Sequence, residues 1–245
     1  MSKSQGTGDE GTPRRGAVGS RRESLSRERV LSTALSLVDA EGGEALTMRR
    51  LARELGCNAM ALYRYAASRD ALLDGVVEIV TAELVIIPGG VDWEAQLRQT
   101  AHEFRNLALA HPHVVPLLVT RPLLTPLGLR PLGTLRPLEQ LMELLVGAGF
   151  SLKDALHVYR AYFGFLYGHV LTELQEVIAN PDESDDLLRL GLHRLPAGEF
   201  PHVRELAPAL AHYDGATELD QGLNILLTGL HGQLNVPARH SADPG

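Results

Sequence analysis

Three consecutive residues, Tyr63, Arg64 and Tyr65, have side chains that suit contact with a nucleic acid. An arginine guanidinium can donate paired hydrogen bonds to guanine O6 and N7 or to a phosphate, and tyrosine hydroxyls can donate to phosphate oxygens. The segment 59–61, Ala-Met-Ala, precedes them and would offer only apolar contacts, for example to thymine methyl groups. These residue types predict a DNA-contacting segment at 59–65.

Two short helices would have to position these side chains. Thr47 can cap a first helix that ends at Gly56, where a left-handed backbone is needed. Asn58 can cap a second, very short helix with Leu62 turned inward. Two helices joined by a short turn containing Gly are the outline of a helix-turn-helix motif, although an ordinary helical hairpin fits the same pattern. The outward face of the short helix would then consist of Ala59, Met60, Ala61, Tyr63, Arg64 and Tyr65.

The formal net charge of −7 is unfavourable for binding DNA, but the charge is unevenly distributed along the chain. Residues 1–70 contain 12 Lys and Arg against 9 Asp and Glu, a net charge of +3. The remaining residues contain 11 against 21, a net charge of −10. Because affinity for a nucleic acid depends on the charge of the contacted surface, the N-terminal part remains compatible with DNA binding.

Apolar periodicity predicts an all-α protein, because every periodic segment has the helical repeat and none has a strand pattern. The expected helices lie at 26–41, 47–55, 59–66, 68–85, 92–111, 138–149, 151–177, 200–215 and 217–234, with only short helices among the prolines of 112–137. Residues 180–199 are acidic and rich in turn formers, either a lid or a passive linker.

A Pro-Gly-Gly break at 88–90 is the expected boundary between two helical domains. The expected parts are a disordered arm at 1–23, a helix-turn-helix domain at 24–87, a second domain at 88–234 and a disordered tail at 235–245. The arm carries two Arg-Arg pairs, which either reach a DNA groove or stay solvated.

Composition predicts a cytoplasmic protein without membrane contact. Cys57 is the only cysteine, so no internal disulfide can form, as is usual in a reducing compartment. No apolar run reaches the roughly 18–20 residues of a membrane span. The N-terminus has basic residues but lacks the apolar segment of a secretory signal.

Residues 46–76, LTMRRLARELGCNAMALYRYAASRDALLDGV, resemble the DNA-binding domain of the TetR (tetracycline repressor-like) family. The positions that carry the resemblance are Thr47, Leu51, Ala52, Gly56, Cys57, Leu62, Tyr63, Tyr65, Arg69, Leu72 and Leu73. Two positions depart from the family pattern, since Ala66 replaces a large apolar residue and Tyr65 replaces a histidine. The resemblance implies phosphate contacts from Thr47, Tyr63, Tyr65 and Arg69, and base contacts from Arg49, Ala59, Met60, Ala61 and Arg64.

The remainder of the chain looks like a C-terminal domain of the tetracycline-repressor type, which implies a ligand pocket and a homodimer. The candidate pocket residues are Phe104, Leu107, Leu118, Leu141, Leu145, Tyr159, Phe163 and Tyr167, although residues at helical spacing are also typical of an ordinary core. Their apolar and aromatic character suits a hydrophobic or amphipathic small molecule. The apolar helices at 151–177 and 217–234 would form a four-helix dimer interface, and a two-fold dimer requires a palindromic operator.

Histidines are the only candidates for a metal site. His111 and His113 are two residues apart and His102 lies one helix earlier, but no cysteine and no HExxH spacing accompanies them. No metal and no cofactor is therefore expected. The chain also lacks a nucleophile elbow, a phosphate-binding loop and a motif of paired carboxylates.

The sequence therefore predicts a ligand-responsive DNA-binding transcriptional regulator, a repressor released from double-stranded operator DNA by a small molecule, and not an enzyme. Two alternatives stay open. The first is a small-molecule enzyme that uses the pocket of the second domain. The second is a helical scaffold without operator binding.

Overall fold

The computed structural model describes residues 25–87, 92–178, 191, 194–206, 208–209 and 213–233, without the side chains of 122–124, 176–178 and 233. The predicted arm at 1–23, the tail at 235–245 and most of the acidic segment 180–199 lie outside these residues. The described part is helical and contains no strand, which confirms the all-α prediction.

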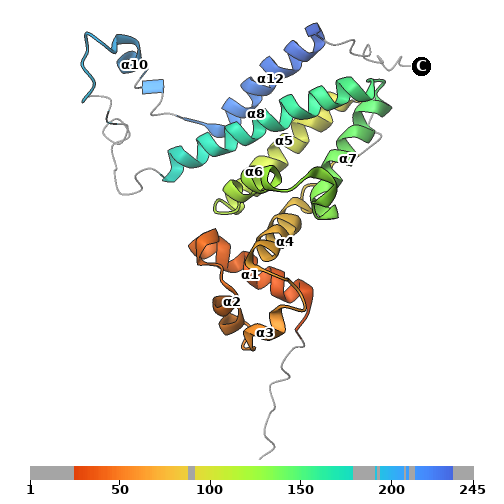
Figure 1. Ribbon diagram of the computed structural model, residues 1–245. Helices are drawn as coiled ribbons and strands as arrows, with labels where there is room; N and C mark the ends of the chain where they lie inside the picture. The colour runs from red at the N-terminus through yellow and green to blue at the C-terminus, as the bar shows by residue number, and fades with distance from the viewer. Residues whose placement is uncertain are drawn as a thin grey trace, which may run out of the picture.

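Four helices and a 3-10 turn form the N-terminal part at the lower end of Figure 1. They are α1 (Arg27–Glu41), η1 (Gly43–Ala45), α2 (Met48–Glu54), α3 (Ala59–Leu62) and α4 (Arg69–Thr81). Each α-helix begins at a side-chain cap, because Ser26, Thr47, Asn58 and Ser68 accept a hydrogen bond from a backbone N–H of the first turn. Local sequence therefore determines where these helices start.

The remaining helices form the body of the molecule in the upper part of Figure 1. They are α5 (Trp93–Ala110), α6 (Val115–Leu124), the 3-10 turn η2 (Leu127–Leu129), α7 (Leu132–Gly147), α8 (Leu152–Ile178), α10 (Pro201–Glu205) and α12 (Gly215–Gln233). No helix of the described residues combines the length and the apolar character that crossing a bilayer requires.

Helix α7 begins six residues before the expected start at 138, and Pro137 lies inside it. A proline within a helix gives up one backbone hydrogen bond. Pro137 is buried on the same side of α7 as Leu141 and Leu144, so apolar burial offsets that loss. The prediction of only short helices up to residue 137 was therefore wrong for this segment.

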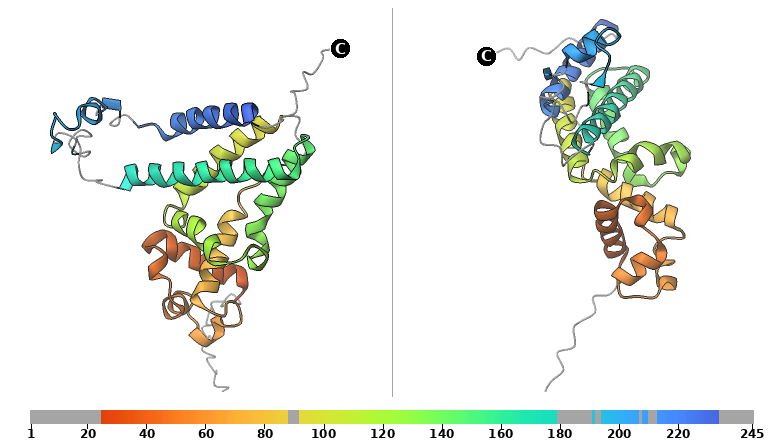
Figure 2. Two further views of the ribbon diagram at one scale, coloured as in Figure 1. Left: turned by 45° about the horizontal axis from the view of Figure 1, so that its top comes forward. Right: turned by 90° about the vertical axis from the view of Figure 1, so that its left-hand side faces the viewer.

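Helices α5, α8 and α12 pack together as the frame of the body, and Figure 2 shows α12 alongside α8. The Arg105 guanidinium of α5 donates to both carboxylate oxygens of the buried Glu173 of α8, from Nε at 2.9 and 3.1 Å. The hydroxyl of the fully buried Tyr162 donates to the carbonyl oxygen of Leu97 at 2.6 Å. Removal of one partner from a buried ion pair is costly, so these contacts hold α5 against α8.

Helix α4 belongs to both parts of the molecule, because it packs on α1 and also on α6 and α7. Its contact with α1 is close, since a Cβ added at Gly75 would lie 2.5 Å from a methyl carbon of Leu31. Residues Leu84 and Ile86, which follow α4, are buried as well. Any displacement of α4 must therefore be shared by the N-terminal part and the body.

Candidate functional site

The turn between α2 and α3 is held by backbone and capping contacts. Gly56 has a φ of 62°, in the left-handed region that favours glycine. The N–H of Cys57 donates to the carbonyl oxygen of Ala52 at 3.0 Å, and Asn58 Oδ1 accepts from the N–H of Met60 at 2.9 Å. Leu62 is fully buried and packs α3 against the hydrophobic core. These contacts position a helix of only four residues.

The outward side of α3 carries the predicted base-contacting residues. Met60 is 72% exposed, Tyr63 is 50% exposed and Arg64 is exposed, whereas Ala59 and Ala61 are half-buried. Thr47 and Arg49, at the start of α2, are exposed as well. The largest solvent-facing side chains of α3 and the two residues after it are therefore one thioether, one phenol and one guanidinium.

Two residues predicted as phosphate contacts, Tyr65 and Arg69, donate hydrogen bonds to backbone carbonyl oxygens within the protein. The Tyr65 hydroxyl donates to the carbonyl oxygen of Leu25 at 2.6 Å. Arg69 donates from Nε to Leu46 O at 2.8 Å and from Nη2 to Gly43 O at 2.7 Å. In this conformation both side chains join segments of the N-terminal part, and their contact with DNA stays a prediction.

Five arginines of the N-terminal part fall into two groups. Arg27 pairs with Glu78 at 2.7 Å, and Arg50 pairs with Glu41 at 2.7 Å. Arg49, Arg53 and Arg64 are exposed and have no ion pair or hydrogen bond with the described residues. Arg53 was not among the predicted site residues, although its position four residues after Arg49 places both on one side of α2.

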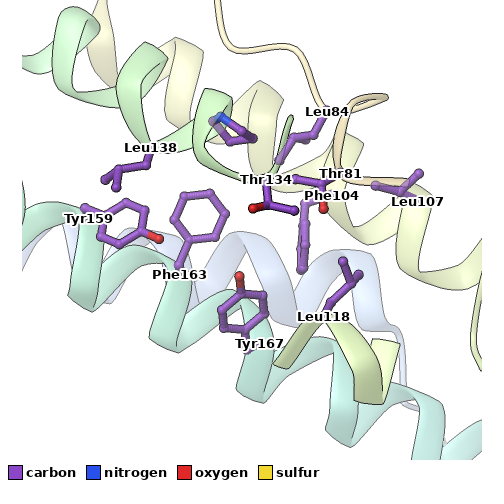
Figure 3. Close-up of a pocket in the computed structure, with 11 residues that line it drawn as sticks. Thr81, Leu84, Phe104, Leu107, Leu118, Thr134, Leu138, Tyr159, Phe163 and Tyr167 are labelled. Atoms are coloured by element: carbon purple, nitrogen blue, oxygen red, sulfur yellow. The ribbon is translucent and has the colours of Figure 1, made fainter. Parts of the chain in front are cut away.

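A cavity with about 410 Å³ of empty space, part of it open to solvent, lies among α4, α5, α6, α7 and α8. Figure 3 shows the residues around it. The predicted pocket residues that line it are Phe104, Leu107, Leu118, Tyr159, Phe163 and Tyr167. Leu141 and Leu145 lie outside the described lining and are fully buried in the core. We call this space the ligand cavity.

Five lining residues were missed by the sequence prediction: Thr81, Leu84, Thr134, Pro137 and Leu138. Three of them stand at spacings of three and four on α7, which is one side of a helix. This signal was hidden because the proline-rich segment was not expected to form a long helix.

The polar groups of the ligand cavity are hydroxyls. The Thr81 hydroxyl donates to Val77 O at 2.6 Å, and the Thr134 hydroxyl donates to Pro131 O at 2.7 Å. The hydroxyls of Tyr159 and Tyr167 have no hydrogen-bond partner within the part of the chain that the structure describes, and Figure 3 shows the Tyr167 hydroxyl directed into the cavity. Burial raises the pKa of both phenols, so both remain protonated donors at neutral pH.

Helix α4 connects the ligand cavity with the α2–α3 surface. Arg121 of α6 donates from Nε to Asp74 of α4 at 2.5 Å, and from Nη1 to Asp70 at 3.3 Å. At the next turn Glu78 accepts from the N–H of Gly133 in α7 at 3.3 Å. Both α6 and α7 contribute to the cavity wall, so the wall is bonded to α4 at three of its residues.

The histidines considered for a metal site bond to carboxylates and a carbonyl. His111 Nδ1 lies 2.9 Å from Asp39 Oδ2, and His113 Nδ1 lies 2.8 Å from Asp39 O. His102 Nε2 lies 2.9 Å from Asp220 Oδ1. Within the described ranges no three potential ligands gather around a common point.

Two family models match this chain. Residues 30–76 match the model of bacterial regulatory proteins of the tetR family, and residues 88–234 match that of the tetracyclin repressor-like C-terminal domain.

Similar proteins extend over nearly the whole chain. An HTH-type transcriptional regulator of Saccharopolyspora erythraea is 30% identical over 93% of this chain and 96% of its own length. The class D tetracycline repressor protein of Escherichia coli is 30% identical over 86% of this chain and 91% of its own. The crystal structure of Streptomyces coelicolor ActR in complex with actinorhodin has a TM-score of 0.72 at 29% identity and covers 87% of this chain and 99% of that one.

Two tyrosine variants separate an internal role from an exposed one. Tyr65→Phe removes the hydrogen bond to Leu25 O and is expected to lower the free energy of unfolding by about 1 kcal/mol. Tyr63→Phe removes an exposed hydroxyl and is expected to change it by less than about 0.5 kcal/mol. Urea denaturation at one fixed protein concentration measures both. Equal stability of the two variants would contradict the internal role of Tyr65.

Proposed function

Because the chain belongs to the tetR family of bacterial regulatory proteins, we propose that it represses transcription from a palindromic operator and leaves that operator when a small molecule fills the ligand cavity. The observation that carries this proposal is the placement of α4. This one helix is bonded to the cavity wall through Asp70, Asp74 and Glu78, and it packs on the N-terminal part that presents α3.

DNA binding is supported by the exposed side chains of α2 and α3. Arg64 and Met60 would lie in the major groove, where a guanidinium can select guanine and a thioether adds apolar contact. Arg49 would read a base from the start of α2, and Thr47 and Tyr63 would donate to phosphates. Tyr65 and Arg69 would serve DNA binding mainly by holding α3 and α4 in place.

Release from the operator follows from a shift between two conformations. A ligand shifts the equilibrium only as far as its affinities for the two conformations differ. Leu118 lines the ligand cavity and stands three residues before Arg121, the side chain that bonds α6 to α4. A ligand that displaces α6 would therefore displace α4 and change the separation of the two recognition helices.

The ligand is expected to be an aromatic or amphipathic molecule. The cavity wall combines aromatic rings with four hydroxyls, a lining that suits a planar body with a few acceptor groups. The related ActR structure contains actinorhodin, and other relatives are tetracycline repressors. We infer that the present chain responds to an aromatic or amphipathic small molecule that contacts the lining of the ligand cavity.

A homodimer would form through the outer sides of α8 and α12. Gly164 and Gly168 of α8 are exposed, and a Cβ added at either would meet no described atom within 4 Å. Ile225 of α12 is 76% exposed, an unfavourable position for a large apolar side chain in a monomer. A second copy would cover these positions, and the dimer would act on DNA in the cytoplasm without catalysing a reaction.

Titration with DNA tests the proposed function. The protein should bind a duplex from the region upstream of its own gene more tightly than a shuffled duplex, and the affinity should fall steeply with salt because phosphate contacts release counterions. Fluorescence anisotropy at several salt concentrations measures this. Equal affinity for both duplexes would exclude sequence-specific regulation through that site and favour the scaffold alternative.

Two arginine variants separate base reading from phosphate contact. Arg64→Ala is expected to weaken operator binding by about 1–3 kcal/mol and to relax the preference at one base pair of each half-site. Arg53→Ala, a matched exposed arginine of α2, is expected to weaken binding uniformly across sequences and to reduce the salt slope by about 1. Arg98→Ala on α5 is the control. A uniform loss for Arg64→Ala would assign Arg64 to a phosphate.

A substitution in α8 tests the dimer. A Cβ added at Gly168 meets no described atom within 4 Å, so Gly168→Phe should leave the helix content by circular dichroism unchanged. The added ring should prevent close approach of a second copy and give a monomer at micromolar concentration in sedimentation. A Cβ added at Gly128 in η2 likewise meets no described atom within 4 Å, and Gly128→Phe should leave the dimer intact. An unchanged mass for Gly168→Phe would place the interface elsewhere.

A further inference from the structure

The polar side chains in the described lining of the ligand cavity are two tyrosines and two threonines. Tyr159 and Tyr167 belong to α8, whereas Thr81 is the last residue of α4 and Thr134 lies in the first turn of α7. Figure 3 shows Thr134 on the side of the cavity opposite Tyr167. The described lining contains no side chain that is charged at neutral pH, so the four hydroxyls decide which polar groups of a ligand can be bound.

Each threonine hydroxyl uses its proton for a bond to a backbone carbonyl oxygen three or four residues earlier. Thr81 donates to Val77 O at 2.6 Å, and Thr134 donates to Pro131 O at 2.7 Å, as threonine commonly does in helices. A hydroxyl has one proton and two acceptor lone pairs. Because both protons are already bonded, Thr81 and Thr134 act as acceptors toward a ligand.

The two tyrosine hydroxyls act as donors, since neither has a hydrogen-bond partner among the described residues. Tyr159, Phe163 and Tyr167 stand four residues apart and therefore share one side of α8. The ring of Phe163 packs against both phenol rings, at centroid distances of 5.1 and 5.9 Å, and Phe104 of α5 lies 5.6 Å from the ring of Tyr167. These ring contacts hold both donors in place before a ligand binds, which reduces the entropy lost on binding.

We propose that the effector is an aromatic carbonyl compound that also bears an O–H or N–H donor. Its carbonyl oxygen accepts from Tyr159 and Tyr167 of α8, and its donor binds the hydroxyl oxygens of Thr81 and Thr134 on the other side of the cavity. This inference rests on the ligand site proposed above and narrows the class of ligand. A molecule with the two groups reversed is disfavoured, because a buried polar group without a partner loses its hydrogen bonds to water without replacement.

Four probes with the same tricyclic body test the proposal on the full chain. Fluorene has no polar group, 9-fluorenone has the carbonyl, 2-hydroxyfluorene has the donor, and 2-hydroxy-9-fluorenone has both. Equilibrium dialysis at neutral pH gives the dissociation constants for the wild type, the double variant Tyr159→Phe with Tyr167→Phe, the double variant Thr81→Val with Thr134→Val, and Thr120→Val. Thr120 of α6 also donates to the carbonyl oxygen four residues earlier, at 2.7 Å, but lies outside the described lining, so it is the matched control.

In the wild type, the carbonyl and the hydroxyl group should each tighten binding about fivefold over the probe that lacks it, the change expected for one net hydrogen bond. The double phenylalanine variant should lose the gain from the carbonyl and keep the gain from the hydroxyl group. The double valine variant should show the reverse, and Thr120→Val should keep both gains. Retained binding of fluorene shows that each variant is folded.

Two outcomes would overturn the proposal. One is equal affinity of the wild type for all four probes. The other is a carbonyl gain that persists in the double phenylalanine variant, or a hydroxyl gain that persists in the double valine variant. If fluorene binds and releases labelled operator DNA as well as the polar probes do, the repressor mechanism stands and the hydroxyl pattern does not. If none of the four probes binds, the ligand cavity of the proposed function is contradicted as well.

Discussion

The acidic residues of α4 are the constraint on which the rest of the molecule depends. Asp70, Asp74 and Glu78 stand four residues apart and therefore share one side of the helix. The first two bond to Arg121 of α6, and the third accepts from the N-terminal end of α7 and from Arg27 of α1. Through this one side, a single helix is thus bonded both to α6 and α7 of the cavity wall and to α1 of the N-terminal part.

The polar side chains of the N-terminal part are divided between internal bonds and the exposed surface. Arg50, Arg69 and Tyr65 bond within the domain, whereas Arg49 and Arg64 remain exposed. The division matters because the domain is small and needs internal hydrogen bonds to supplement its apolar core. It also shows how a chain with a net charge of −7 can expose three arginines, Arg49, Arg53 and Arg64, on and beside two short helices.

The sequence-based predictions were accurate for features that depend on residues close together along the chain. The caps at Thr47 and Asn58, the left-handed Gly56 and the buried Leu62 were all predicted, because each depends on residues within a few positions along the chain. By contrast, Tyr65 bonds to a carbonyl forty residues earlier, and no local pattern indicates such a partner.

The lining of the ligand cavity likewise could not be predicted fully from local sequence patterns. Leu141 and Leu145 have the helical spacing of lining residues, but the cavity lies beside the preceding turns of α7, where Thr134 and Leu138 stand. Its position depends on how five helices cross, and periodicity within one helix carries no information about that crossing.

Helix α3 has only four residues, and its largest exposed side chain contributes little to the core. An isolated helix of this length is unstable in water, so α3 persists because Leu62 and the caps hold it. Substitutions at Met60 or Arg64 would therefore leave the free energy of folding almost unchanged, and under the proposed function they would alter which bases are recognised. After gene duplication, the two copies could acquire different operators through such changes without first acquiring a more stable fold.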